Sequence, residues 1–157
     1  MPNTNEPTSH SPAADERSNH CFGCGPSNPQ GMHLTFAIDA TDSAHVTSTT
    51  TVQLSRIYQG PPGYIHGGII ATLMDEAMSK LNRPLNVLAF TRHMEIDYLR
   101  PAPIDQPLTL IGTHLSRKGR KLFHQAELKL PNGSILARAK GLFIALTPEQ
   151  LSSVQIN

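Results

Sequence analysis

Residues 67–82 read GGIIATLMDEAMSKLN, and this stretch carries the clearest helical repeat in the chain. Its apolar side chains recur at i, i+3, i+4, i+7, i+8 and i+11, which places them on one face of an α-helix. We expect this face to lie in the core; it consists of Ile70, Leu73, Met74, Ala77, Met78 and Leu81. Asp75 belongs to a different face, together with Gly68, Ala71, Thr72, Ser79 and Asn82.

The sequence on both sides of this helix predicts β-strands, two before it and four after it. In the third strand the even positions from Leu88 to Tyr98 form an apolar face that only Arg92 interrupts. One long central helix against one face of a highly curved antiparallel sheet buries the helical stripe economically. We therefore predict an α+β fold with about six strands, at 32–39, 45–54, 88–99, 107–116, 121–130 and 134–146.

Length and charge limit the possible functions. A chain of 157 residues forms one domain, and 13 Lys and Arg against 12 Asp and Glu give it no general attraction to nucleic acid or an anionic membrane. It has no apolar run of the ~18 residues that span a bilayer, and its first twenty residues lack the apolar middle of a secretory signal. We expect a cytoplasmic protein. Residues 1–20 contain no Ile, Leu, Val or Phe, so we expect a flexible tail before a domain at 21–157.

The start of the predicted helix carries a specific pattern. His66 is followed by two glycines, Asp75 comes nine residues after His66, and Thr91 comes sixteen residues after Asp75. This pattern resembles the His-Gly-Gly segment of the hotdog-fold acyl-CoA thioesterases, in the PaaI-like group of the thioesterase superfamily. The likeness covers about residues 21–146 and includes the lead-in CFGCG and the loop GPPG that precedes the histidine.

The resemblance implies a hotdog fold and hydrolysis of an acyl-CoA thioester to a free acid and coenzyme A. It also implies a homodimer, or a dimer of two such dimers. We expect no cofactor apart from the coenzyme A portion of the substrate. Two alternatives stay open: a hydratase or dehydratase of the same fold that acts on acyl thioesters, and a non-catalytic module that binds acyl-CoA or fatty acids.

Thioester hydrolysis needs an activated water or a carboxylate nucleophile, and donors aimed at the developing oxyanion. The first N–H groups of a helix are unpaired, so the Gly67 amide can be that donor, and Gly68 adds no side chain that would block the substrate. We assign Asp75 as general base or nucleophile and Thr91 as the residue that holds the water. His66 positions the loop, or contacts the substrate directly.

Helix geometry separates these groups. Nine residues at ~1.5 Å each put Asp75 roughly 13 Å along the axis from His66. One thioester carbon cannot be within bonding reach of both ends of that span. If both groups act on it, they come from two chains whose helices run antiparallel across a two-fold axis. The sequence therefore predicts an obligate dimer with two composite sites. The alternative for Asp75 is an ordinary solvated helix residue.

Further residues are candidates for substrate binding. Some relatives place an asparagine six residues before the histidine to polarise the thioester carbonyl; that position is Gly60 here, and the neighbouring Gln59 is the candidate substitute. Four cations between Arg117 and Lys121 are candidates for the coenzyme A phosphates, or else form a solvated hairpin end. They are Arg117, Lys118, Arg120 and Lys121.

The remaining polar residues receive simpler interpretations. Cys21 and Cys24 form a Cys-x-x-Cys pair, but a structural zinc site wants four ligands, so we expect reduced thiols in a turn and no metal. Glu76 precedes Lys80 by four residues and predicts a surface ion pair. The histidines at 93, 114 and 124 are expected to be polar strand residues.

Overall fold

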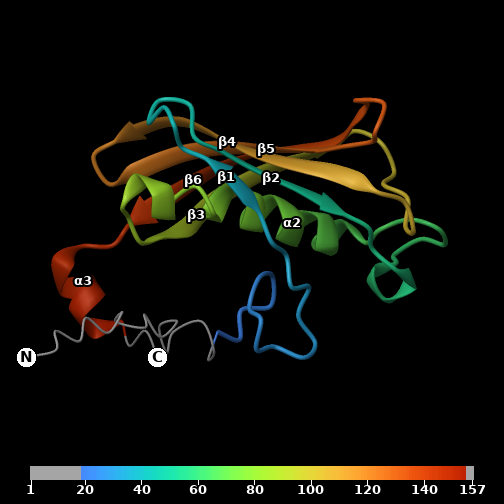
Figure 1. The fold of residues 1–157 in the computed structure, drawn as a ribbon, viewed down its shortest axis with the longest axis horizontal. Helices are drawn as coiled ribbons and strands as arrows, with labels where there is room; N and C mark the ends of the chain where they lie inside the picture. The colour runs from blue at the N-terminus through green and yellow to red at the C-terminus, as the bar shows by residue number, and fades with distance from the viewer. Residues whose placement is uncertain (1–18, 155–157) are drawn as a thin grey trace, which may run out of the picture.

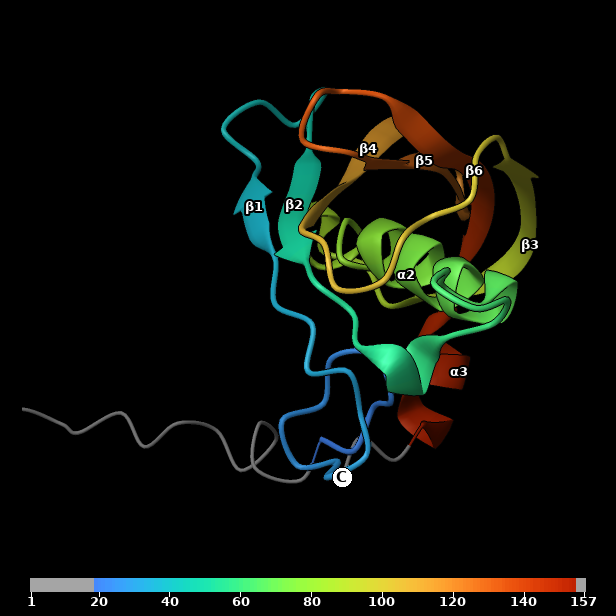
Figure 2. The ribbon, with the colours of Figure 1, turned by 90° about the vertical axis from the view of Figure 1, so that its right-hand side faces the viewer.

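The computed structural model describes residues 19–154, so most of the predicted tail lies outside the described residues. The fold is one six-stranded antiparallel sheet that curves around a central helix, as Figure 1 shows from the side and Figure 2 from one end. The strand order is β1-β2-β4-β5-β6-β3, which leaves β1 and β3 at the two edges. The strands are β1 Ala37–Asp39, β2 Thr47–Val52, β3 Ala89–Tyr98, β4 Leu108–Lys118, β5 Lys121–Lys129 and β6 Ile135–Ala145.

The predicted helix is α2, Gly67–Ser79, and its apolar stripe is buried against the concave face of the sheet. The α+β prediction and the core stripe are therefore confirmed. The helix ends three residues before the predicted end, and a turn follows it. Two 3-10 turns, Arg56–Tyr58 and Arg83–Leu85, flank the helix. No helix of residues 19–154 is long and apolar enough to cross a membrane.

The first strand is shorter than the sequence predicts. Residues 32–36 do not pair with β2, because the N–H groups of Met32 and Leu34 donate to carbonyl oxygens of the preceding Cys-x-x-Cys loop. His33 between them has a positive φ of 51°, which breaks the extended conformation. Only Ala37–Asp39 pairs with β2. The interpretation of 32–39 as one continuous strand is wrong for its first half.

Strand β3 contains a bulge that the alternation rule misses. Thr91 pairs with Phe143 and His93 pairs with Leu142, so Arg92 is an extra residue without a partner position on β6. A one-residue bulge exchanges the two faces of a strand. Before the bulge, the odd positions therefore face the helix, and Phe90 is 56% exposed instead of buried. The prediction that the even positions form one apolar face holds only after Arg92.

A short C-terminal helix, α3 Pro148–Ser153, was not predicted. Thr147 caps it by accepting a hydrogen bond from the Gln150 N–H, and the Gln150 side chain accepts one from the Thr147 N–H. This reciprocal pair is a capping box. The sequence signal, Thr followed three residues later by Gln, is present at 147–150.

His124 lies on strand β5, as predicted, but it is fully buried, which the sequence analysis did not foresee. Its Nε2–H donates to Asn82 Oδ1 at 2.9 Å, and Asn82 is itself buried instead of lying with Asp75 on a free helix face. A neutral imidazole has one N–H, so His124 Nδ1 accepts from His114 Nδ1–H at 3.1 Å. Burial, and next the neighbouring His114, lower the pKa of His124 to about 4.

This network predicts a loss of stability in acid. The unfolded chain protonates His124 near its ordinary pKa of 6.5, whereas the folded protein keeps it neutral down to about 4. The free energy of unfolding should therefore fall as the pH drops through this window, by up to about 3 kcal/mol from His124. Urea unfolding at several pH values should show a shallower loss for His124→Gln. His93→Gln, which replaces an exposed histidine, is the control; equal slopes in wild type and His124→Gln would contradict the assignment.

Candidate active site

His66 caps helix α2. Its Nδ1 accepts a hydrogen bond from the Gly68 N–H at 2.9 Å, and its carbonyl oxygen accepts from the Ile69 and Ile70 N–H groups. Three of the four free N–H groups of the first turn are thereby used. The fourth, on Gly67, donates to no group of the described residues. The capping pattern leaves one backbone donor, with the partial positive charge of a helix start, for an external acceptor.

The loop before the helix is fixed by its own hydrogen bonds. The His66 N–H donates to the Tyr58 carbonyl, and Gln59 Oε1 accepts from the Gly63 N–H, each at 2.9 Å. Gln59 therefore closes the loop within the chain. Gly60 packs directly on His66, because a Cβ at this position would lie 2.9 Å from His66 Cα. The asparagine found here in some relatives has no room unless the loop moves.

Asp75 and Thr91 are in direct contact, whereas the sequence analysis assigned Thr91 only to hold the water. Thr91 Oγ1 donates to Asp75 Oδ1 at 2.6 Å, which joins α2 to the edge strand β3. The bulge at Arg92 places the Thr91 side chain on the helix side of the sheet. Burial raises the pKa of Asp75, the Thr91 hydrogen bond opposes this rise, and the neighbouring Glu76 charge adds to it. A half-buried carboxylate with a raised pKa suits a proton acceptor.

Gly67 and Asp75 stand at separate places along α2. Asp75 comes eight positions after Gly67, which corresponds to ~12 Å of helix. Strand β3 runs beside the helix in the opposite direction and contacts both places: Thr91 bonds to Asp75, and Tyr98 Oη donates to the Gly67 carbonyl at 3.0 Å. Within one chain the Asp75 carboxylate and the free Gly67 amide therefore lie at two separate places, each named a half-site below.

The sequence interpretation missed Tyr98 as a site residue. Besides holding the Gly67 carbonyl, Tyr98 lines an apolar cavity of about 530 Å³ beside the helix start. Its ring is 54% exposed although it lies on the helix side of the strand. A phenol at the end of an otherwise apolar alternation was the available signal. The cavity is bounded by Pro61, Tyr64, Ile65, Gly67, Ile70 and Tyr98, among others.

The four predicted coenzyme A ligands lie at the β4–β5 turn, at the same end of the sheet as Thr91. Arg120 is held by the Ala145 carbonyl at 2.8 Å and by Gln150 Oε1 at 3.2 Å, and Arg117 bonds to the Gly119 carbonyl. Lys118 and Lys121 are exposed. Strand β6 separates β5 from β3, so the Lys121 backbone lies two strand spacings, about 10 Å, from the edge strand, whereas Arg117 and Lys118 on β4 lie one strand further away.

Comparison with known proteins agrees with this geometry. A single helix inside a curved antiparallel sheet of this order is the hotdog fold, and a thioesterase superfamily model matches residues 62–137. A crystallised thioesterase superfamily protein superimposes with a TM-score of 0.69 and 29% identity, over 86% of this chain and 73% of that chain. A Streptococcus mutans UA159 protein bound to acetyl CoA superimposes with a TM-score of 0.62 and 19% identity, over 72% of this chain and 90% of that chain.

The chain is also similar to curated proteins named acyl-coenzyme A thioesterases. Acyl-coenzyme A thioesterase THEM4 of Bos taurus is 33% identical over 97 residues, which is 60% of this chain and 39% of that protein. Acyl-coenzyme A thioesterase THEM5 of Homo sapiens is 29% identical over 100 residues, 60% of this chain and 38% of that protein. The chain thus spans well under half of these relatives. The resemblance to hotdog-fold thioesterases is confirmed at the level of the family.

The contact between Thr91 and Asp75 can be tested without an activity assay. Thr91→Val removes the hydroxyl that stabilises the charged carboxylate, so the pKa of Asp75 should rise further. Thr91→Ser keeps a hydroxyl and should leave it close to wild type. The side-chain carboxyl carbon of Asp75, followed by NMR across pH, gives the value directly. An unchanged or lower pKa in Thr91→Val would show that the hydrogen bond is absent in solution.

Proposed function

We propose that this protein is an acyl-CoA thioesterase whose two active sites each combine Asp75 and Thr91 of one protomer with the Gly67 amide of its partner. The observation that carries the proposal is the half-buried Asp75 carboxylate held by Thr91, on the same helix as an unused Gly67 N–H. The ~12 Å between them is compatible with one reacting carbon only if two chains supply the groups.

The chemistry follows from these groups. Thr91 occupies Asp75 Oδ1, so the second carboxylate oxygen is available to accept a proton from water or to attack the thioester carbon itself. The Gly67 N–H of the other chain stabilises the oxygen that becomes negative. If Asp75 is the base, the water oxygen forms the new C–O bond, the C–S bond breaks, and the proton taken from water passes from the carboxyl group to the coenzyme A sulfur. If Asp75 is the nucleophile, its oxygen forms the new C–O bond of a mixed anhydride and the thiolate leaves; a water then cleaves the anhydride to the free acid and the Asp75 carboxylate, and its second proton goes to the thiolate. His66 and Tyr98 act as positioning residues. His66 accepts a hydrogen bond from the Gly68 N–H, and Tyr98 donates one to the Gly67 carbonyl, so together they fix the start of the helix.

The edge strand β3 supports the proposed dimer. It lies at the end of the sheet, and its outer edge faces no other strand of residues 19–154. A ten-residue open edge is a template for pairing with another chain. Phe90, Tyr98 and Leu99 expose 50–56% of their surface at this edge. Antiparallel pairing of two β3 strands would bring the two α2 helices side by side in opposite directions.

Solved relatives support the substrate class and the two catalytic side chains. Neighbours from Streptococcus mutans and Streptococcus pneumoniae were crystallised with acetyl CoA and with coenzyme A, respectively. The pneumococcal protein was also crystallised as alanine variants of an aspartate and of a threonine 16 positions further on, the separation of Asp75 and Thr91. For this chain, acyl-CoA as substrate and the phosphate role of the turn at 117–121 are part of the proposal.

The proposal predicts thiol release from acyl-CoA esters and its loss in Asp75→Asn. The turnover number of the variant should fall by roughly 100- to 10,000-fold, the range of a lost general base. Because burial raises the pKa of Asp75, its charge is unfavourable in the folded protein at neutral pH. Asp75→Asn should therefore melt at the same temperature as wild type or higher. Ellman's reagent follows the released thiol, and a thermal melt follows the fold.

Short, medium, long-chain and aryl acyl-CoAs should be compared in this assay. Glu95→Gln, which changes an exposed carboxylate on β3, is the matched control and should keep wild-type turnover. Wild-type turnover in Asp75→Asn would rule out the mechanism. Tight binding of acyl-CoA without thiol release would indicate a binding module, and addition of water to an enoyl-CoA would indicate a hydratase.

A further inference from the structure

The predicted surface pair of Glu76 and Lys80 is real but half-buried, and it lies against the Cys-x-x-Cys loop. Glu76 Oε2 lies 3.6 Å from Lys80 Nζ, and the Glu76 side chain is only 12% exposed. Oε2 is buried and has no hydrogen-bond partner in the described residues. The predicted ion pair is therefore confirmed, but its predicted place at the surface is wrong. A buried carboxylate oxygen without a hydrogen bond needs another explanation.

The two cysteines lie next to the Glu76 carboxylate. Cys21 Sγ donates to Glu76 Oε1 at 3.5 Å. The two sulfur atoms and a carboxylate oxygen of Glu76 all lie within 4.8 Å of one another. The loop is seated closely on the helix, because a Cβ at Gly23 would lie 2.3 Å from Glu76 Cγ. The fold thus brings together three ligand groups from two segments that are 55 residues apart.

We propose that Cys21, Cys24 and Glu76 form a binding site for Zn²⁺, with a fourth position open to water. Thiolate and carboxylate are both common zinc ligands, and three protein ligands with an open position are a known zinc arrangement. The sequence alone offered two ligands; the structure supplies the third. This inference is independent of the proposed function, since none of the three residues takes part in that mechanism.

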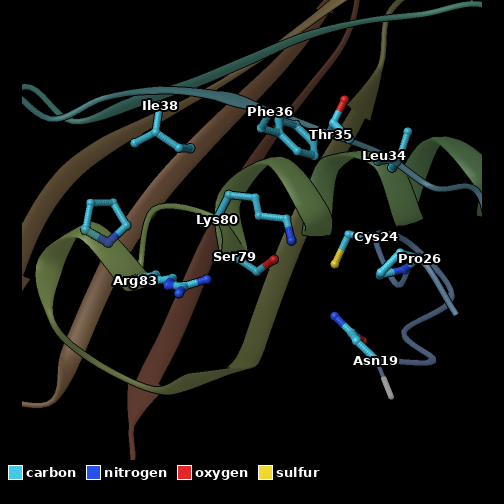
Figure 3. A pocket seen from close by; sticks show the side chains of 11 residues that line it. Asn19, Cys24, Pro26, Leu34, Thr35, Phe36, Ile38, Ser79, Lys80 and Arg83 are labelled. Carbon is cyan, nitrogen blue, oxygen red and sulfur yellow. The ribbon is translucent and has the colours of Figure 1, made fainter. Parts of the chain in front are cut away.

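The position and charge of Lys80 are compatible with a zinc-bound site. Figure 3 shows the Lys80 and Cys24 side chains side by side on the wall of a cavity of about 510 Å³. Two thiolates and a carboxylate around Zn²⁺ leave one negative charge, which the Lys80 ammonium balances. A partner of this kind around a metal ligand strengthens binding. The cavity and the exposed side of Cys21 give water access to the fourth position.

Zinc titration of the reduced, chelator-treated full-length protein tests the site. Competition with a chromogenic zinc chelator should show one tightly bound Zn²⁺ per chain, and both thiols should become protected from Ellman's reagent. Cys21→Ser and Cys24→Ser should lose this binding. Glu76→Gln keeps the size of the side chain and should weaken binding by at least roughly tenfold, because even outer partners of a metal site contribute that much. Glu149→Gln, at an exposed glutamate, is the matched control.

Cobalt(II) provides a second readout that does not depend on affinity. The wild-type protein should show the thiolate-to-cobalt charge-transfer band of a two-sulfur site, and Cys21→Ser, at an exposed position, should lose intensity while its melting temperature stays unchanged. Zinc affinity in Glu76→Gln equal to wild type would overturn the assignment. So would a reduced wild-type protein that retains no zinc, or one whose two cysteines simply form a disulfide under the same conditions.

Discussion

The arrangement of the proposed site follows from the fixed distance that helix α2 sets between Gly67 and Asp75. The helix is continuous over Gly67–Ser79 and is held in the concave sheet by a fully apolar stripe, so the distance between Gly67 and Asp75 cannot change appreciably. At each of these two positions, a neighbouring residue occupies some of the hydrogen-bonding groups and leaves one unused. His66 uses its ring and its carbonyl oxygen to occupy three N–H groups and leave one, and Thr91 occupies one oxygen of Asp75 and leaves the other.

Strand β3 connects the fold to the proposed chemistry. It contacts the helix at both half-sites, through Thr91 and Tyr98, while its outer edge stays open. The bulge at Arg92 makes both contacts possible, because Thr91 and Tyr98 are seven residues apart and would otherwise point to opposite faces. An edge strand that positions both half-sites is also the natural place for a second copy to join, which ties the proposed dimer to the proposed catalysis.

The parts of the fold that follow from periodicity could be predicted, namely the helix stripe and the antiparallel strands. The resemblance singled out Asp75 and Thr91, but the hydrogen bond between them is seen only in the structure. The parts that depend on one extra residue or on tertiary neighbours could not. Nothing in the alternation of 88–99 shows that Arg92 is bulged. In the sequence His124 looks like any polar strand residue, and only the folded structure shows its buried hydrogen bond to Asn82. Glu76 satisfies the spacing of a surface pair, and only the seating of the loop at 21–25 buries it.

Mixing two inactive variants tests the shared site most directly. Asp75→Asn removes the carboxylate, and Gly67→Pro removes the free N–H; proline suits a first helical position, and His66 already has φ −62° and ψ 137°. Gly67→Ala keeps the N–H and makes only an ordinary 3.7 Å contact with Tyr98, so it is the control. After subunit exchange, half the dimers carry one intact site, and about a quarter of wild-type thiol release should return. A mixture as inactive as its components would contradict a site shared between chains.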